Sequence, residues 1–430
     1  MRRTIKKGKR ILGIILTACM LMSLAGCGEE VIISEDHVEE NCRNTNMNAV
    51  MKTDKGFYYS QKGELSLHYY DTVNKKNMFL CNKPECRHDG NEFCVATSDK
   101  YQVMHTLLYS GSLYINVIEE TETSYEFKVL KASLDGSSLS EVVTYHSVGN
   151  TEVFPDTGDK MIIHRNKAFL PYTVYNAENN EVGYNGVAIY DMDTKEVTYL
   201  GEKEQSFDLQ YGRFCGYGDY MYYSTSEKYR MELHRYCYTD GTTEKLGVKN
   251  FKGAYAIYDE NTIFYKAINE SFFVYNMETG ENKYISVDDL GSVRLHTDEK
   301  DGLSQGYGVG FKLADVLSDG EYVYVSFNYS FHGNYLPNSN SAMGIVFDKA
   351  IIGVLDKEGQ EVNRIYLNTT DLLGYSDYFT LHFMGDTVYM QTPSMMYECS
   401  KESFIAGEPD FKEVYPIDIK MWSMKEHQEK

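Results

Sequence analysis

The stretch GDYMYYSTSEKYRMELHRYCYTDG, residues 218–241, shows the pattern that decides the fold. A Gly-Asp turn introduces a short strand centred on Tyr222, and a polar segment leads to a second strand that ends in Thr-Asp-Gly. A third apolar stretch, TEKLGV (243–248), follows at once. Short alternating strands separated by turns of this chemistry predict an antiparallel meander.

The first strand of this meander recurs along the chain at intervals of 42 to 65 residues. Its central residue is aromatic each time: Tyr58, Tyr114, Phe169, Tyr222, Phe264, Tyr324 and Tyr389. One such unit cannot bury both of its faces, so the units must stack on one another. We therefore predict an all-β fold, a single β-propeller of four-stranded antiparallel blades. Seven blades are expected, with six or eight as alternatives, and a solenoid or two β-sandwiches would also accommodate the repeat.

The composition agrees with one large β domain. Tyrosine, which favours half-buried strand positions, occurs 38 times, and proline only seven times. No linker rich in proline, glycine or serine divides the repeats, and long amphipathic helical patterns are absent. We assign residues 51–420 to the propeller and residues 421–430 to a C-terminal tail.

The N-terminus carries a targeting signal. Six basic residues within the first ten precede an apolar run of about 14 residues, which is short of the roughly 20 that span a bilayer. An uncleaved membrane anchor is the alternative. The run ends in Leu24-Ala25-Gly26-Cys27, which resembles the lipobox of bacterial lipoproteins. The resemblance implies that residues 1–26 are a signal peptide and that the Cys27 thiol carries a diacylglyceryl group.

A lipid on Cys27 would fix the location of the protein. Two or more acyl chains hold a protein stably on a membrane. Residues 27–50 are polar and acidic and are expected to form a flexible tether. We expect the rest of the chain to lie on the extracytoplasmic face of the cell membrane of a Gram-positive bacterium. We expect it to be a monomer that is attached to this membrane through the lipid.

The charge excludes one class of partner. Without the six basic residues of the signal peptide, 36 basic and 63 acidic residues remain, a net charge of −27. Nucleic acid would repel such a protein, and so would anionic lipid head groups. The acidity serves solubility in the first place, and cation binding is the functional alternative.

The second strands of the repeat suggest a family. LHRYCYTDG (233–241), FVYNMETG (273–280) and AIYDMDT (188–194) resemble the YWTD-type propellers of lipoprotein receptors and the TolB-like propellers. The resemblance covers most of residues 54–416, although the tryptophan of the YWTD repeat is missing throughout. It implies the propeller fold and no functional residue.

A cysteine cluster is the second notable feature. Cys81, Cys86, His88 and Cys94 lie in CNKPECRHDGNEFC, residues 81–94. This stretch resembles a short element of surface lipoproteins of gut Clostridia that carry such propellers, whose role the resemblance does not supply. Three thiolates and an imidazole could bind zinc tetrahedrally, although the spacing departs from that of zinc fingers. Disulfides suit an exported protein, and free thiols suit an anaerobe. The mature chain has seven cysteines besides Cys27, so disulfides alone would leave one thiol free.

No catalytic motif stands out in the sequence. G-x-S-x-G, H-E-x-x-H and the P-loop are all absent, and no catalytic residue is assigned. We therefore predict a non-catalytic module that binds a ligand, a glycan or a protein, without a cofactor unless zinc occupies the cysteine cluster. The alternative is an extracytoplasmic hydrolase or lyase acting on glycans with carboxylates in the propeller channel. A solute-capture subunit of a transporter is a third reading.

Overall fold

A computed structural model describes most of the chain after the tether. The described residues are 42–44, 50–60, 63–90, 94–149, 153–155, 160–176, 182–206, 209–228, 230–268, 271–286, 309–331, 349–368, 379–392 and 395–417. The chain divides into two units, Met1–Glu39 and Glu40–Lys430, and every described residue belongs to the second. The predicted signal peptide, Cys27 and the C-terminal tail lie outside the described residues. Within the described part, no helix is both long enough and apolar enough to cross a membrane.

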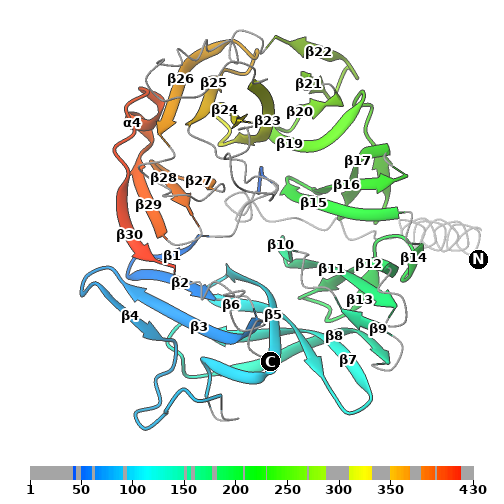
Figure 1. Cartoon of the computed structure of the whole chain (residues 1–430). Coiled ribbons are helices and arrows are strands. Elements are labelled where there is room, and N and C mark those ends of the chain that lie inside the picture. Colours follow the sequence, from blue (N-terminus) through cyan, green and yellow to red (C-terminus); the bar gives the residue numbers. More distant parts are fainter. Residues whose placement is uncertain are drawn as a thin grey trace, which may run out of the picture. The chain divides into compact units, whose positions relative to one another are not determined.

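The described strands pair into six antiparallel sheets (Figure 1). The first sheet holds two meanders, which are joined where β3 pairs with β5. Its strands are β1 (Met51–Thr53), β2 (Gly56–Ser60), β3 (Gly63–Asp71), β4 (Lys76–Phe79), β5 (Thr97–Tyr109), β6 (Ser112–Glu120), β7 (Ser124–Ser133) and β8 (Leu139–Gly149).

The other five sheets follow in chain order, and each contains one four-strand meander. The second sheet holds β10 (Ile162–His164), β11 (Lys167–Asn176), β12 (Val182–Asp191) and β13 (Val197–Tyr199). Two short strands, β9 (Val153–Pro155) and β14 (Gln205–Ser206), extend it. The third sheet holds β15 (Leu209–Tyr217), β16 (Tyr220–Glu227), β17 (Arg230–Cys237) and β18 (Thr243–Lys245). The next two are β19 (Phe251–Asp259), β20 (Thr262–Ala267), β21 (Phe272–Asn276) and β22 (Asn282–Ile285), and β23 (Val309–Ser318), β24 (Val323–Phe331), β25 (Lys349–Leu355) and β26 (Glu361–Asn368). The last is β27 (Thr380–Met384), β28 (Thr387–Gln391), β29 (Met395–Ser400) and β30 (Lys412–Pro416), with the helix α4 (Lys401–Ile405) between its last two strands.

The seven recurring aromatic residues occupy equivalent positions, as the repeat predicts. Each lies in the second strand of a meander, in β2, β6, β11, β16, β20, β24 and β28, and each is buried. Tyr222 on β16, for example, pairs with Cys215 on β15 and with Arg235 on β17. The all-β propeller of four-stranded antiparallel blades is thus confirmed.

The expected number of blades is wrong. Five blades stand as separate sheets, against the seven expected from the sequence. The first two units do not separate, because β3 runs on past its partner strands and pairs through Gly63–Ser66 with the start of β5. Turn chemistry marks the ends of individual strands, but it does not show that two successive meanders share backbone hydrogen bonds.

Among the residues that the structure describes, six apolar clusters form the core, each between one sheet and the next. The cluster that closes the ring joins the last sheet to the first. In it the ring of Phe57 lies 5.1 Å from that of Tyr415 and 5.8 Å from that of Tyr389. Buried aromatic pairs add about 0.5–1.5 kcal/mol each beyond the area that they bury.

The first strand of each meander is the one nearest the centre of the propeller, and residues 42–44 lie across three of these inner strands (Figure 1). The amide of Cys42 donates to the carbonyl of Gly216 on β15, at 2.6 Å, and the amide of Ile257 on β19 donates to the carbonyl of Arg43. The Asn44 side chain exchanges two hydrogen bonds with the backbone of Ser318 on β23, at 2.6 and 2.7 Å. Residues 42–44 of the predicted tether are therefore fixed to the propeller.

Candidate functional site

The four residues of the cysteine cluster converge in space. They lie in the segment between β4 and β5, where the first meander gives way to the second. The donor atoms of Cys81, Cys86, His88 and Cys94 all lie within 4.8 Å of one another. Cys94 is buried in the closing cluster, and the other three are half-buried. This Cys3His cluster could hold a metal ion.

Hydrogen bonds within the segment shape the cluster. The amide of Cys86 donates to the carbonyl of Lys83 at 3.1 Å, which forms a tight turn between the first two cysteines. The amide of Gly90, at φ +82°, donates to the Thr97 hydroxyl at 3.2 Å, and that hydroxyl contacts Cys94 Sγ at 3.2 Å. The start of β5 therefore positions Cys94 from one side.

The turn between β7 and β8 supports the segment from another side. The amide of Asn82 donates to the carbonyl of Gly136 at 3.2 Å. Gly136 has φ +68°, and a Cβ atom there would lie 2.8 Å from the Cys81 nitrogen and from the Leu80 carbonyl group. Only glycine combines this backbone conformation with so close an approach.

The electrostatics of the thiols differ across the cluster. Burial alone would raise the pKa of Cys81, but amides of Lys83 and Val95 and the neighbouring thiols outweigh it and lower this pKa. At Cys86 a backbone hydrogen bond at His88 favours the thiolate, yet burial and the neighbouring Cys94 and Cys81 leave its pKa raised. Thiols close together cannot all ionise without a cation, and a bound metal ion supplies one.

His88 completes the set of donors. Its Nδ1 lies 3.6 Å from Cys94 Sγ, and its ring stacks on Phe79 with 4.8 Å between centroids. Zn–S bonds of about 2.3 Å in a tetrahedral site separate the sulfurs by about 3.8 Å. The donors here therefore need only small shifts to surround one ion.

The predicted proximity of Cys81, Cys86 and Cys94 is confirmed, but the disulfide expected among them is not shown. All seven cysteines that the structure describes are free. Apart from the cluster they are Cys42, Cys215, Cys237 and Cys399. Cys42 lies beside Cys215, because its amide donates to the carbonyl of Gly216. Cys27 lies outside the described residues.

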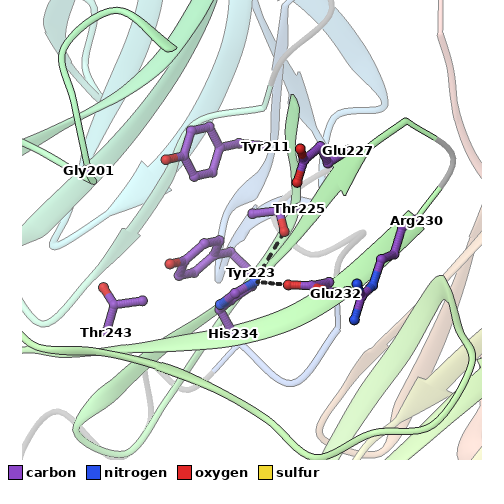
Figure 2. Close-up of a pocket in the computed structure, with 9 residues that line it drawn as sticks. All are labelled: Gly201, Tyr211, Tyr223, Thr225, Glu227, Arg230, Glu232, His234 and Thr243. Carbon is purple, nitrogen blue, oxygen red and sulfur yellow. Dashed lines mark hydrogen bonds and ion pairs between the residues drawn. The ribbon is translucent and has the colours of Figure 1, made fainter. Parts of the chain in front are cut away.

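A cavity of about 310 Å³ lies against the sheet of β15–β18 (Figure 2). The His234 ring stacks on Tyr223, and its Nε2 lies 3.1 Å from the Thr225 hydroxyl and 3.6 Å from Glu232. Burial lowers the pKa of His234, and Glu232 offsets this only in part. Glu232 also pairs with Lys245. His234, Thr225, Glu232 and Lys245 thus form one chain of contacts, and we assign no catalytic chemistry to this cavity.

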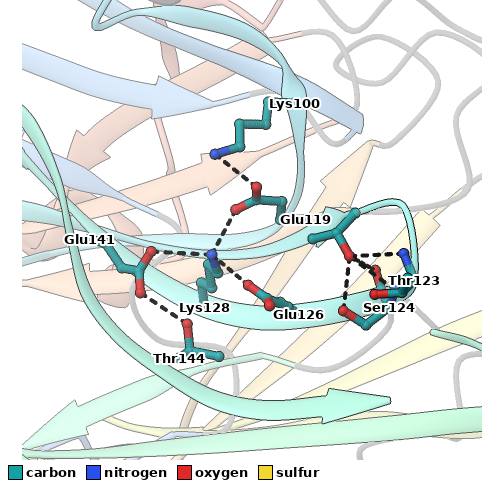
Figure 3. A network of polar contacts seen from close by, with 9 residues as sticks. Lys100, Glu119, Thr123, Ser124, Glu126, Lys128, Glu141 and Thr144 are labelled. Carbon is teal, nitrogen blue, oxygen red and sulfur yellow. Dashed lines mark hydrogen bonds and ion pairs between the residues drawn. The ribbon is translucent and has the colours of Figure 1, made fainter. Parts of the chain in front are cut away.

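A network of ion pairs lies in the second meander (Figure 3). The Lys128 ammonium on β7 contacts the carboxylates of Glu119, Glu126 and Glu141 at 2.8, 2.7 and 3.2 Å. Lys100 binds Glu119 from the other side at 2.7 Å. The three carboxylates and two ammonium groups leave a net charge of only −1, which indicates a structural role for the network.

Charged residues on the inner strands escaped the sequence reasoning. Arg213 on β15 and Asp315 on β23 lie far apart in the sequence, but Nη1 and Oδ1 approach to 3.5 Å. Arg213 is the one charged residue of β15, LQYGRFCGY, and a lone charge within a strand is a signal that could have revealed it. Asp315 shares β23, VGFKLADVLS, with Lys312 and carries no such signal.

Comparisons with known proteins add little beyond the fold. No family model and no curated protein matches the chain. A solved structure of an uncharacterized protein from Listeria monocytogenes EGD-e is 9% identical, with a TM-score of 0.42 over 74% of this chain and 83% of that chain. Prolyl oligopeptidase B from Galerina marginata is 10% identical, with a TM-score of 0.48 over 88% of this chain and 51% of that one. An oligogalacturonate lyase in complex with manganese is 9% identical, with a TM-score of 0.38 over 69% of this chain and 74% of that one. Likenesses at this level say nothing of activity, and the fold rests on the structure itself.

Proposed function

We propose that the protein is a lipid-anchored, extracytoplasmic β-propeller that binds a ligand or partner at the cell surface without catalysing a reaction. The observation that carries this proposal is the attachment of residues 42–44 to three inner strands. These residues belong to the segment that follows the lipobox-like stretch, and they are hydrogen-bonded to β15, β19 and β23. An anchor at Cys27 would thus be joined to the propeller by the short segment of residues 28–41.

The maximum length of this segment can be estimated from the sequence. Fourteen residues separate Cys27 from Cys42. A fully extended chain advances about 3.5 Å per residue, so the point of attachment stays within about 50 Å of the membrane. A rigid ring held at this distance suits capture or display of a partner at the surface.

Substitution of the lipobox cysteine tests the anchor. Cys27→Ser should release the protein from the membrane fraction or leave an uncleaved precursor, because serine cannot form the thioether to the lipid. Cys19→Ser, which changes the other cysteine of the leader, is the matched control and should fractionate as wild type. Normal fractionation and normal mass of Cys27→Ser would refute the lipid anchor.

We further propose that the Cys3His cluster binds one zinc ion as a structural element. The support is the convergence of four suitable donors and their bracing by Thr97 and Gly136. Because all four positions of a tetrahedral site are filled by protein, zinc here would have no open position for substrate. Its contribution would be to stability at the junction between β4 and β5.

Metal analysis of the purified chain tests the zinc site. Wild type should contain about one zinc per chain, and both Cys86→Ser and His88→Ala should lose most of it. Cys237→Ser, which alters a half-buried cysteine outside the cluster, should keep it. A disulfide would need no histidine. A metal-free wild-type chain that is lighter than its reduced form by two hydrogens would overturn the zinc proposal.

The alternative of a glycan hydrolase or lyase gains no support from the site. Glycoside hydrolases commonly use two carboxylates, roughly 5–9.5 Å apart, that act as acid and base or nucleophile. The carboxylate of Asp315 comes to the centre in contact with the guanidinium of Arg213, which makes an ion pair rather than an acid–base pair. We therefore propose binding rather than catalysis.

A further inference from the structure

The cavity of about 310 Å³ in Figure 2 lies on the face of the β15–β18 sheet that points towards the preceding sheet. Tyr223, which lines it, packs with Phe169 on β11 and Val187 on β12. Because side chains alternate along a strand, every second residue of β16 and β17 reaches this face. These residues are Tyr223, Thr225 and Glu227 on β16, and Arg230, Glu232 and His234 on β17. The volume lies at the lower end of the range of about 300–1,000 Å³ for small-molecule pockets.

The polar lining of this face departs from the repeat. Counted from the recurring aromatic residue of each strand, β11 places Tyr172 and Val174 where β16 places Thr225 and Glu227. Tyr172 and Val174 are fully buried in an apolar cluster, whereas Glu227 is exposed. Packing between sheets requires apolar side chains at these positions. The polar residues therefore mark a part of the face that the preceding sheet leaves open.

Two tyrosines form the apolar wall of the cavity. The ring of Tyr211 on β15 lies 5.9 Å from that of Tyr223, which stacks on His234 at 5.3 Å. The Tyr211 hydroxyl donates to the carbonyl of Leu200 at 3.1 Å, and this contact positions the ring. Tyr223 is buried, but Tyr211 is half-buried, so part of its side chain is accessible. An aromatic ring offers an apolar surface on which the C–H groups of a ligand can pack.

Hydrogen-bonding groups of both kinds lie beside this wall. The Thr225 hydroxyl, 3.1 Å from His234 Nε2, can donate or accept. A hydrogen bond from Lys245, together with the charges of Lys245 and Arg230, outweighs burial and lowers the pKa of Glu232, which is therefore an ionised acceptor at pH 7. Nε of Arg230 lies 3.0 Å from Glu232, and this side chain is 76% exposed, so its other N–H donors are accessible.

The formal charges at the cavity cancel. Glu227 and Glu232 carry two negative charges, and Arg230 and Lys245 carry two positive ones. Burial, which Glu232 offsets only in part, lowers the pKa of His234, so the imidazole is neutral at pH 7. The whole chain has a net charge of −21, so a balanced cavity stands out on its surface. Such a cavity favours an uncharged ligand, because a charged one would lose hydration without a net attraction in return.

We propose that this cavity binds one sugar ring of an uncharged glycan. This inference deepens the binding role proposed above and rests on it. A pyranose ring combines a face of C–H groups with hydroxyls that both donate and accept hydrogen bonds. The C–H face matches the tyrosine wall, and the hydroxyls match the groups of Thr225, Glu227 and Arg230.

Ligand-observed NMR on the full mature chain tests the cavity with three uncharged probes, methyl β-D-glucopyranoside, methyl β-D-galactopyranoside and methyl N-acetyl-β-D-glucosaminide. At least one of them should bind, with a dissociation constant of about 1 mM. Tetrahydropyran-2-methanol has the ring without its hydroxyls and should bind at least about tenfold more weakly, because the polar groups of the cavity would stay unpaired. Methyl β-D-glucuronide, which adds a carboxylate, should also bind more weakly than the best uncharged probe.

Substitutions in the cavity identify the groups that contact the sugar. Glu227→Gln should weaken the best probe about fivefold, because an amide forms weaker hydrogen bonds than a carboxylate. Glu244→Gln is the matched control and should leave binding unchanged, since Glu244 lies on the other face of the same sheet, pairs with Arg235 and is 59% exposed. Tyr211→Ala should weaken the probe at least about tenfold, whereas Tyr211→Phe, which keeps the ring, should bind nearly as wild type.

The inference is overturned if none of the three uncharged probes binds, or if tetrahydropyran-2-methanol or the glucuronide binds as tightly as they do. It is also overturned if either Glu227→Gln or Tyr211→Ala binds as wild type. Urea unfolding of each variant separates loss of a contact from loss of the fold. Cys27→Ser should bind the probes as wild type does, so failure of the sugar test leaves the membrane anchor standing, and a failed anchor leaves the sugar test standing.

Discussion

Lys128→Met removes the cation at the centre of the network in Figure 3 and leaves its three glutamates facing one another. The side chains of Lys128 and Glu119 keep only 9% and 8% of their surface exposed. Methionine has nearly the same length as lysine, so the variant changes charge far more than packing. We expect a clear loss of stability at neutral pH.

The size of the loss follows from the exposure of each glutamate. Loss of one partner from a fully buried ion pair costs about 3–5 kcal/mol. Glu126 and Glu141 are 30% and 46% exposed, so water can solvate them after the substitution. Glu119 is nearly buried but keeps Lys100. The expected loss is therefore about 2–3 kcal/mol, below the range for a fully buried pair.

The loss should depend on pH. Burial raises the pKa of Glu119, and Lys100 and Lys128 together more than offset this in wild type, so the pKa is lowered. Without Lys128, burial and the neighbouring glutamates should raise it above that of the unfolded chain. The folded variant then takes up protons more readily than its unfolded state as the pH falls, so its deficit should shrink between pH 7 and about pH 4.5.

Urea unfolding at pH 7 and pH 4.5 measures both effects. Lys100→Met is the matched control, because Lys100 contacts the same Glu119 at 2.7 Å but is 54% exposed, and its loss should cost under about 1 kcal/mol. Equal losses for the two variants at pH 7, or a loss in Lys128→Met that stays constant down to pH 4.5, would refute this reasoning.

Three further substitutions test other parts of the structure. Tyr222→Ala empties a site that is 1% exposed and should cost about 3–5 kcal/mol in urea unfolding, whereas Tyr284→Ala, 49% exposed, should cost little. Gly136→Ala should lower the stability and the zinc content of the chain more than Gly111→Ala does. Both glycines have a similar positive φ, but only Gly136 contacts the cysteine segment. Equal effects of the two substitutions would argue against that contact. Burial, with a smaller contribution from Lys203, lowers the pKa of His146 to about 4. The neutral imidazole therefore contributes its full stabilisation above pH 6.5, and this contribution is lost as the pH falls towards 4. That loss amounts to about 3 kcal/mol, and His146→Gln should show a flatter stability profile over this range.

Much of the fold could be read from local patterns. The aromatic strands and their Asp-, Asn- and Gly-rich turns located β2, β3 and their equivalents, because strand alternation and turn chemistry are local properties. The inner strands were not identified. Bulges interrupt β15 between Gly212 and Cys215 and β23 between Leu313 and Asp315, and they break the alternation that marks a strand. The blade count failed because the pairing of β3 with β5 is a contact between units.

The candidate site was predictable to the extent that its residues are close in sequence. Cys81, Cys86, His88 and Cys94 fall within fourteen residues, so their convergence in space could be expected. Their support by Gly136, and the meeting of Arg213 with Asp315, depend on contacts between distant strands. No spacing in a single sequence reports such contacts.

The apolar cluster that closes the ring also governs the order in which the chain can fold. Phe57 and Tyr59 come from its beginning, and Tyr389, Met396 and Tyr415 come from its end. A chain synthesised from its N-terminus delivers the first group early and the last group late. Until Tyr415 has emerged, the first and last sheets both present uncovered apolar sides, which makes the incomplete chain prone to aggregation. A truncation that removes only β30 should therefore impair the whole protein rather than its last blade.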